Sequence, residues 1–276
     1  MGIQSFLQAE KGDPDWQFSP DEYFGKQFKL SDANTIELKE DRADRVTLRL
    51  TPNEKGLLAK NLRMDVRDGA KLDVLILNDS GPGTQQVFIY DIRIREGAVL
   101  NLGIFVKGGK FNKHIFQIEI EEGGTLASYG YMSNSDQGDT EIITKVYQRG
   151  QSSLCTQLIG AQAGSHSQTV YQGMVQVHKD AVESEAGLES LNLITGTEGR
   201  CYSKPEITYD TSLCKTRYAS QTSTIDGTMM QYLASKGLDE VQATDILVTS
   251  FQNSIFRLIP QEELRQEVDQ MFKTSE

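Results

Sequence analysis

Four copies of one short phrase decide the fold of this chain: Arg67-Asp68-Gly69-Ala70, Arg95-Glu96-Gly97-Ala98, Glu121-Glu122-Gly123-Gly124 and Gln148-Arg149-Gly150-Gln151. In each copy a polar or charged pair precedes glycine. The four glycines, at positions 69, 97, 123 and 150, lie 28, 26 and 27 positions apart, and weaker copies follow at 178–181 and 197–200. A fixed period of this size is typical of stacked units that cannot bury their apolar faces alone.

An alternating apolar run follows each phrase. These runs are Leu72–Leu77, Val99–Val106, Leu126–Tyr131 and Leu154–Ile159. Alternation with period two indicates strands, and two or three strands with their turns need about 25–30 residues. The sequence therefore predicts a mainly β protein, a β-solenoid of the parallel β-helix type with one coil per repeat. We expect each glycine to supply the positive φ of a corner. A β-sandwich is the alternative.

The pattern changes near Ile225, and the chain is expected to divide into three parts. These are an irregular N-terminal arm (1–30), the β-helix (31–224) and a C-terminal helical domain (225–276). Asp226 and Asp239 are expected to cap two helices, and Pro260 to separate the second helix from a third. The helices either cap the open end of the solenoid or dock a partner. Trp16, the single tryptophan, is expected to pack on the solenoid end.

Composition narrows the class of protein. The chain has 276 residues, and 28 Lys and Arg against 39 Asp and Glu give a net charge of −11, which argues against nucleic-acid binding. No apolar run is long enough to span a membrane, and the N-terminus does not read as a cleavable signal. Three cysteines without metal-type spacing favour a reduced, cytoplasmic setting.

The last third of the chain carries a recognisable order of residues. It contains Lys204-Pro205-Glu206-Ile207, then Thr222-Ser223-Thr224-Ile225-Asp226, then Met230-Gln231-Tyr232-Leu233 and Lys236-Gly237-Leu238. This order resembles the C-terminal region of the SufB/SufD family, the scaffold proteins of the SUF iron–sulfur cluster assembly system, over about residues 165–260.

The resemblance implies a right-handed parallel β-helix with a helical C-terminal segment and a non-enzymatic scaffold role. It also implies a SufB/SufD-type partner, or a second copy, joined through the β-helix, and a SufC-type ATPase bound through the C-terminal helices. A cluster would be held transiently at a subunit interface. The helices expected to dock the ATPase carry these residues: Met229, Met230, Tyr232, Leu233, Leu247, Phe251 and Ile255.

The chain departs from the family pattern at the positions expected to handle sulfur. Tyr218 stands where the family usually has histidine, and Glu189 stands near the position of the sulfur-accepting cysteine of SufB. The chain is therefore closer to SufD. Cys201 and Cys214 lie near these positions and are candidates for cluster or sulfur handling, since assembly needs thiolates. The alternative is that both are small buried side chains.

The three histidines are too scattered to form a metal set, so they are expected at surfaces or turns, and the metal ligands stay unknown. Two other functions are compatible with a β-helix. One is an enzyme acting on polysaccharide, although no closely spaced Asp pair follows the coils. The other is a structural adaptor that carries no cluster.

Overall fold

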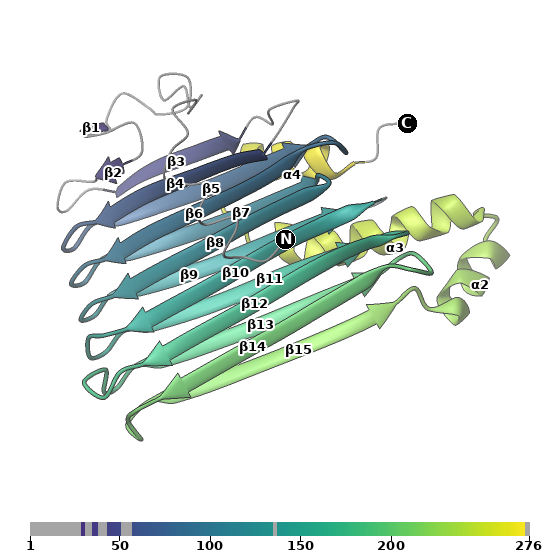
Figure 1. The fold of residues 1–276 in the computed structure, drawn as a ribbon. Helices are drawn as coiled ribbons and strands as arrows, with labels where there is room; N and C mark the ends of the chain where they lie inside the picture. Colours follow the sequence, from purple (N-terminus) through teal and green to yellow (C-terminus); the bar gives the residue numbers. More distant parts are fainter. Residues whose placement is uncertain (1–28, 31–34, 38–42, 51–56, 135–136, 274–276) are drawn as a thin grey trace.

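A computed structural model describes residues 29–30, 35–37, 43–50, 57–134 and 137–273 (Figure 1). This part of the chain forms a parallel β-helix followed by three helices, so the predicted fold class is confirmed. Each coil contributes one strand to each of two facing sheets. Strands i and i+2 are therefore neighbours, and from β2 onward every described pairing is parallel. A sandwich of sequential antiparallel strands is thus excluded.

The eight strands of the first sheet, here sheet A, are β1 (Lys29–Leu30), β2 (Thr35–Glu37), β4 (Leu57–Val66), β6 (Gln85–Ile94), β8 (Phe111–Ile120), β10 (Gly138–Gln148), β12 (Ser167–Val177) and β14 (Arg200–Tyr209). The seven strands of sheet B are β3 (Ala43–Leu50), β5 (Lys71–Ser80), β7 (Val99–Gly108), β9 (Thr125–Asn134), β11 (Leu154–Ala163), β13 (Glu185–Ile194) and β15 (Lys215–Thr224). All four predicted apolar runs lie within strands β5, β7, β9 and β11.

The interior between the sheets is filled by columns of side chains that repeat from coil to coil. One column of sheet B reads Leu72, Leu100, Leu126, Cys155 and Ala186, and all five are buried. Such stacking follows from the period-two alternation, because register pairing places equivalent residues above one another. Cys155 is therefore a core residue.

One corner of the β-helix holds a column of left-handed backbone conformations. Its members are Gly69 (φ 67°), Gly97 (64°), Gly123 (62°), Ser152 (53°) and Glu183 (59°). The N–H of each of the first four donates to a carbonyl of the next coil, at 2.8–2.9 Å. Glycine was correctly predicted for the first three corners.

The prediction that Gly150 supplies the fourth corner is wrong, because Ser152 holds the positive φ there. Gly150 is required for a different reason. A Cβ atom at this position would lie 2.0 Å from the backbone nitrogen of Glu122 in the previous coil. Gly150 thus permits two turns to approach each other closely. Gln151 and Ser152 follow it and complete the corner.

The helices are α2 (Gly227–Ser235), α3 (Glu240–Phe256) and α4 (Glu262–Phe272). Asp226 and Asp239 cap α2 and α3 as predicted, with carboxylate oxygens that accept from Thr228 N at 2.9 Å and Gln242 N at 2.8 Å. The last strand ends at Thr224, close to the predicted boundary. The division into domains stays a prediction, and most of the arm, including Trp16, lies outside the described residues.

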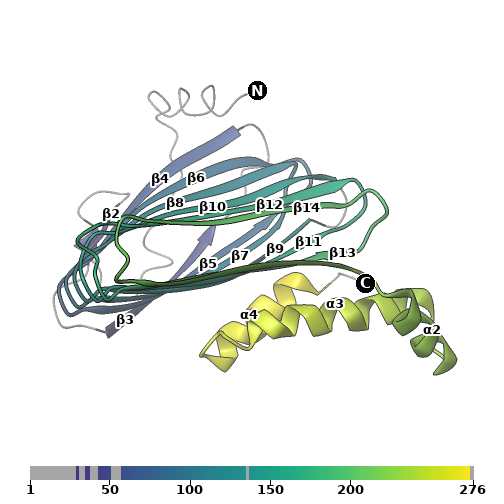
Figure 2. The same cartoon turned by 90° about the horizontal axis from the view of Figure 1, so that it is seen from below.

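Helices α3 and α4 lie along the outer face of sheet B rather than over the end of the solenoid (Figure 2). They bury a second core, here called the helix–sheet cluster. It consists of Leu75, Leu77, Phe105 and Tyr131 of sheet B with Ile255, Phe256, Ile259, Val268 and Phe272. Two polar contacts fasten α4: Arg49 of β3 pairs with Glu267 (2.7 Å), and Lys107 donates to the Met271 carbonyl (2.6 Å).

Candidate functional site

The last coil of the β-helix, formed by β14 and β15, is open. Among the described residues, each strand pairs on one side only, with β12 and β13 respectively. Tyr209 and Tyr218 continue inward-facing columns behind Val177 and Leu188, yet they are 58% and 65% exposed. An uncovered edge with apolar side chains is a template for another chain.

The two open edges are not equivalent. β14 carries Pro205 in its middle, and proline has no N–H to donate to an added strand. β15 (Lys215–Thr224) has no proline and is rich in threonine and serine. β15 therefore offers the uninterrupted row of backbone donors and acceptors at this end.

Cys201 lies near the start of β14, in an inner column behind Thr169. The Thr169 hydroxyl donates to its sulfur at 3.2 Å, and the sulfur lies 3.7 Å from the Leu193 carbonyl oxygen. Burial raises the pKa of the Cys201 thiol above its ordinary value, although the hydrogen bond from Thr169 opposes the shift. The chain alone thus favours the neutral thiol, which is a poor nucleophile.

Cys214 lies beyond the other end of β14, directly before β15. It is half-buried and packs against the interior core, with its sulfur 3.4 Å from the Thr211 carbonyl oxygen. Burial raises its pKa as well. Eight residue steps of β14 separate Cys201 from Tyr209, and at about 3.3 Å per residue they span roughly 26 Å. The two thiols therefore lie at opposite corners and cannot ligate one cluster within a chain.

The other two sulfur candidates lie close to each other on neighbouring strands. Tyr218 pairs with Leu188, which is buried inside, whereas Glu189 points outward with Ala219. Both Tyr218 and Glu189 line a groove of about 590 Å³ on the outer face of sheet B, together with Arg217 and Leu258. Among the residues that the structure describes, no group of three His, Cys, Asp or Glu could hold a metal ion.

The predicted docking residues divide into exposed and covered sets. Met229 and Tyr232 are 43% and 55% exposed on α2, a helix without buried residues. Met230, Leu233 and Leu247 are half-buried. Phe251 packs against the helix–sheet cluster, and Ile255 is fully buried in it.

Ile255 is thus a core residue. While α3 packs on sheet B, Ile255 is not available to contact an ATPase, so its prediction as a docking residue is wrong. It occupies a surface left free by Gly160 of β11, where a Cβ atom would lie 2.0 Å from its Cδ1. The sequence pattern missed Val241 and Ile246 of α3, which are 78% and 45% exposed.

The histidines include one exception to the prediction. His166 and His178 lie at turns, next to Glu198 (2.6 Å) and Asp180 (3.2 Å). His114 is fully buried inside the β-helix, with Nδ1 3.0 Å from the Tyr90 hydroxyl and Nε2 3.1 Å from the Asn78 amide. Burial lowers the pKa of His114 to about 3. Both ring nitrogens have polar partners, and the ring stacks on Phe88, so His114 is a neutral, structural residue.

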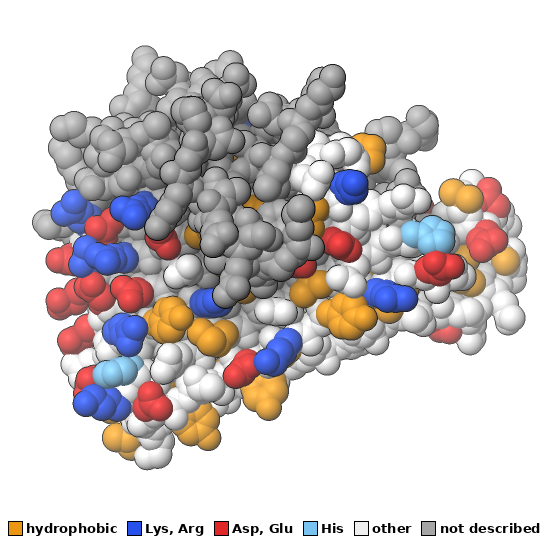
Figure 3. Space-filling model, viewed as in Figure 1, with side chains coloured by type: hydrophobic (Ala, Val, Ile, Leu, Met, Phe, Trp, Pro, Cys, Tyr) orange, Lys and Arg blue, Asp and Glu red, His pale blue; other side chains and the backbone are white. Residues whose placement is uncertain are grey.

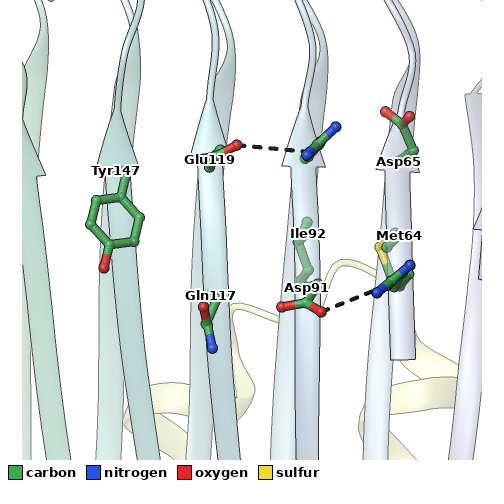
Figure 4. A pocket seen from close by; sticks show the side chains of 9 residues that line it. Met64, Asp65, Asp91, Ile92, Gln117, Glu119 and Tyr147 are labelled. Carbon is green, nitrogen blue, oxygen red and sulfur yellow. Dashed lines mark ion pairs between the residues drawn. The ribbon is translucent and has the colours of Figure 1, made fainter. Parts of the chain in front are cut away.

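Charged side chains gather along one edge of the molecule, where the corners from sheet A to sheet B lie (Figure 3). A groove of about 470 Å³ on sheet A brings Asp65, Asp91 and Glu119 together from neighbouring strands (Figure 4). From the sequence, no closely spaced Asp pair was expected along the coils. Each carboxylate faces an arginine: Arg95 lies 2.9 Å from Asp65, and Arg63 and Arg93 lie 3.8 Å from Asp91 and Glu119.

Glycoside hydrolysis uses two carboxyl groups that flank the scissile bond. In this groove each carboxylate instead faces an arginine. The groove therefore gives little support to the polysaccharide enzyme.

Comparison with known proteins agrees with the fold. The model of the family described as "SUF system FeS cluster assembly, SufBD core domain" matches residues 25–251. The chain belongs to the SufBD family. Membership connects it with iron–sulfur cluster assembly, as the resemblance implied.

SufBD relatives with curated descriptions include three iron–sulfur cluster assembly SufBD family proteins. The chloroplastic protein of Arabidopsis thaliana is 24% identical over 148 residues, which cover 54% of this chain and 26% of the relative. The ycf24 protein of Guillardia theta is 22% identical over 139 residues, 50% and 28% of the two chains. A Synechocystis protein is 24% identical over 157 residues, 55% and 34%. The matched region thus spans about a third or less of these SufBD relatives.

The described helices contain none that is both long and apolar enough to cross a membrane.

Proposed function

We propose that this SufBD chain is a non-enzymatic, cytoplasmic scaffold subunit of a SUF-type assembly complex. It is closer to SufD than to SufB, because Glu189 replaces the sulfur-accepting cysteine. The observation that carries the proposal is the open last coil. A β-helix whose terminal tyrosines are more than half exposed is suited to a second β-helix.

The partner is either a SufB/SufD-type β-helix or a second copy of this chain. β15 supplies an edge for strand addition, in which main-chain hydrogen bonds give affinity and side chains give specificity. Tyr218, which follows Leu188 in an inner column, would be buried by such a partner. Pro205 makes β14 the weaker of the two edges.

A cluster is the cargo of such a scaffold. Iron–sulfur clusters are held mainly by cysteine thiolates, and this chain offers one thiol at each end of its last coil. These two thiols lie at opposite ends of β14, so the donor set within one chain is incomplete. Cys201 or Cys214 would hold a cluster only together with side chains of the partner, at the interface.

The SufC-type ATPase would bind α2 and the first turn of α3. Met229, Tyr232 and Val241 expose apolar surface there, away from the helix–sheet cluster. Because α2 follows β15 directly, the ATPase and the partner β-helix would contact adjacent parts of the chain.

The two surfaces are separable by experiment. The chain is co-expressed with a SufC-type ATPase, and complexes are measured by light scattering after size-exclusion chromatography. Tyr218→Asp should lose β-helix pairing and keep the ATPase, whereas Tyr232→Asp should do the reverse. Tyr202→Asp is the matched control, because Tyr202 is 54% exposed on the outer face of the same coil. Equal behaviour of Tyr218→Asp and Tyr202→Asp would refute pairing through the open end.

The cluster is tested separately by anaerobic reconstitution of the complex. Cys201→Ala or Cys214→Ala should lower the amount of bound iron per folded protein. Cys155→Ala, which changes a core residue, should leave that ratio unchanged. Unchanged iron in both variants would favour the adaptor that carries no cluster.

A further inference from the structure

The backbone of the last coil determines which residues would meet a chain added at the open end (Figure 1). The N–H of Asp210, directly after β14, donates to the Val177 carbonyl of β12 at 2.9 Å. Successive residues of a strand direct their N–H and C=O groups to opposite edges. Even-numbered residues of β14 therefore bond to β12, and odd-numbered residues face the open edge. The odd-numbered side chains, Cys201 and Tyr209 among them, are also those that point inward.

The charges of β14 select one register for an antiparallel copy of the same strand. Inward residues must lie opposite inward residues, so the centre of the pair can move only by whole residues. With Pro205 opposite Pro205 of the second copy, Lys204 faces Glu206. In the same register Arg200 faces Asp210. Moving the centre by one residue places Lys204 opposite Lys204, or Glu206 opposite Glu206. Opposite charges stabilise such pairs and like charges destabilise them, so the centre at Pro205 is favoured.

Strand β15 accepts the same arrangement. Ser203 Oγ lies 2.6 Å from Ser190 Oγ across the interior, which aligns the centre of β14 with about Tyr218 of β15. Lys215 and Arg217 both precede that point, so in an antiparallel pair each of them faces an uncharged residue of the second copy. A second copy of this chain therefore complements the charges of both open strands.

We propose that a second copy pairs with the open coil in this register, and that Cys201 of each copy shares a metal site with Cys214 of the other. The inference rests on the proposed scaffold function. Cys201 lies opposite Tyr209 of the second copy, with about 5.5 Å between Cα atoms. The corner that follows Tyr209 ends at Cys214, which packs against the interior core. Two thiols that lie at opposite corners of one chain thus share a corner across the pair, and this happens twice.

Two thiols at one corner can bind a metal that a single thiol cannot hold. Thiolates are the preferred ligands of soft metal ions and of iron–sulfur clusters. The Thr169 hydroxyl, which donates to the Cys201 sulfur at 3.2 Å, orients this ligand. Each thiol releases its proton to solvent as it binds the metal. The expected ligand is therefore a thiolate-bound metal centre, with one site for each chain of the pair.

Complementation between two variants tests the shared site. Differently tagged Cys201→Ala and Cys214→Ala chains are produced separately and together, and the reduced proteins are treated with a short bismaleimide. The unmodified chain should give a covalent dimer on a denaturing gel, and neither variant alone should. The mixed pair, purified through both tags, should regain the cross-link, because one of its corners holds both thiols. Cys155 is fully buried and is expected to stay unmodified.

Cobalt(II) provides a second readout, through the charge-transfer absorption of its thiolate complexes. We expect one ion per chain in the unmodified pair and one ion per two chains in the mixed pair. Either variant alone should lose the band. Circular dichroism shows whether each variant folds, and Cys201→Ser and Cys214→Ser replace an alanine variant that does not.

Charge reversal tests the register. Lys204→Glu places like charges opposite one another at the centre of β14, and it should raise the dissociation constant of the pair by roughly tenfold or more. Glu206→Lys in the same chain exchanges the two charges and should restore pairing. Failure of the double variant to recover would contradict this register.

Other outcomes separate this inference from the proposed function. A dimer of the unmodified chain that the reagent does not cross-link, or a cross-link within either single variant, would overturn the shared site. A chain that stays monomeric alone yet binds a SufB/SufD-type β-helix would overturn it too, while the scaffold function would stand. If instead the open end does not pair at all, Tyr218→Asp and Tyr202→Asp behave alike, and both proposals fail.

Discussion

The helix–sheet cluster allows one quantitative test of how firmly the helices are attached. Ile255 is fully buried against Gly160 and Tyr131, so Ile255→Ala removes three carbons from a packed site. Substitutions of this kind cost about 2–5 kcal/mol in the free energy of unfolding. Ile246→Ala is the control. It lies on the same helix at 45% exposure, so the difference in helix propensity between Ile and Ala is shared by both variants.

The assay is urea denaturation followed by circular dichroism, together with limited proteolysis of the C-terminal segment. We expect Ile246→Ala to change stability by less than about 0.5 kcal/mol. Ile255→Ala should also expose α3 and α4 to protease before the β-helix unfolds. A difference below 0.5 kcal/mol between the two variants would contradict the packing described above.

A double mutant sharpens the same prediction. Gly160→Ala alone should destabilise the protein, because its Cβ would lie 2.0 Å from Ile255 Cδ1. In the Ile255→Ala background that atom is absent, and Tyr131 Cδ2, at 3.0 Å, becomes the nearest neighbour of the added Cβ. The second substitution should then cost less, with a coupling of about 1 kcal/mol or more between neighbouring sites. Strict additivity would argue against this contact.

Three further predictions concern the β-helix and its attachment. Because burial lowers the pKa of His114 to about 3 while the unfolded chain binds a proton near pH 6.5, stability should fall by about 1.4 kcal/mol per pH unit below 6.5. His114→Asn should remove that slope in urea titrations at pH 7.5 and 5.5, and an unchanged slope would assign it to other groups. Gly97→Ala should lower the free energy of unfolding by about 1–2 kcal/mol through its positive φ alone, because nothing lies near the added Cβ. Gly81→Ala, which has neither a positive φ nor a near neighbour, should be neutral or stabilising. Equal melting temperatures of the two variants would refute this. Glu267→Gln should weaken the pair with Arg49 by less than about 1 kcal/mol, with a smaller effect in high salt, because both side chains are partly exposed.

The repeating coils were easier to predict from the sequence than the residues at their corners. The period and the alternating runs predicted the coils, and Asp226 and Asp239 marked two helix starts. Ser152 and Glu183 were missed as corner residues, because only glycine signals a left-handed conformation in a sequence. Stacked N–H···O bonds with neighbouring coils help to hold these two residues in a conformation that non-glycine residues adopt at a cost.

The position of the helices could have been recognised from the strands. β5 and β7 contain the continuous apolar runs Leu75-Ile76-Leu77 and Ile104-Phe105-Val106, in which both faces need cover. Candidate sulfur residues could not be placed in this way. Cys201 and Cys214 are close in sequence, but Cys201 lies at the start of β14 and Cys214 lies beyond its end, so the strand carries them to opposite corners.

The contact between Arg49 and Glu267 joins residues 218 positions apart. Solenoids can in principle unravel from either end, one unit at a time, because each unit contacts only its neighbours. Here the helical segment that follows the last coil runs back until α4 contacts β3, so one segment joins the first and the last coil. Unfolding of the coil at either end would break that connection. We therefore expect this chain to melt more cooperatively than its repetitive architecture alone suggests.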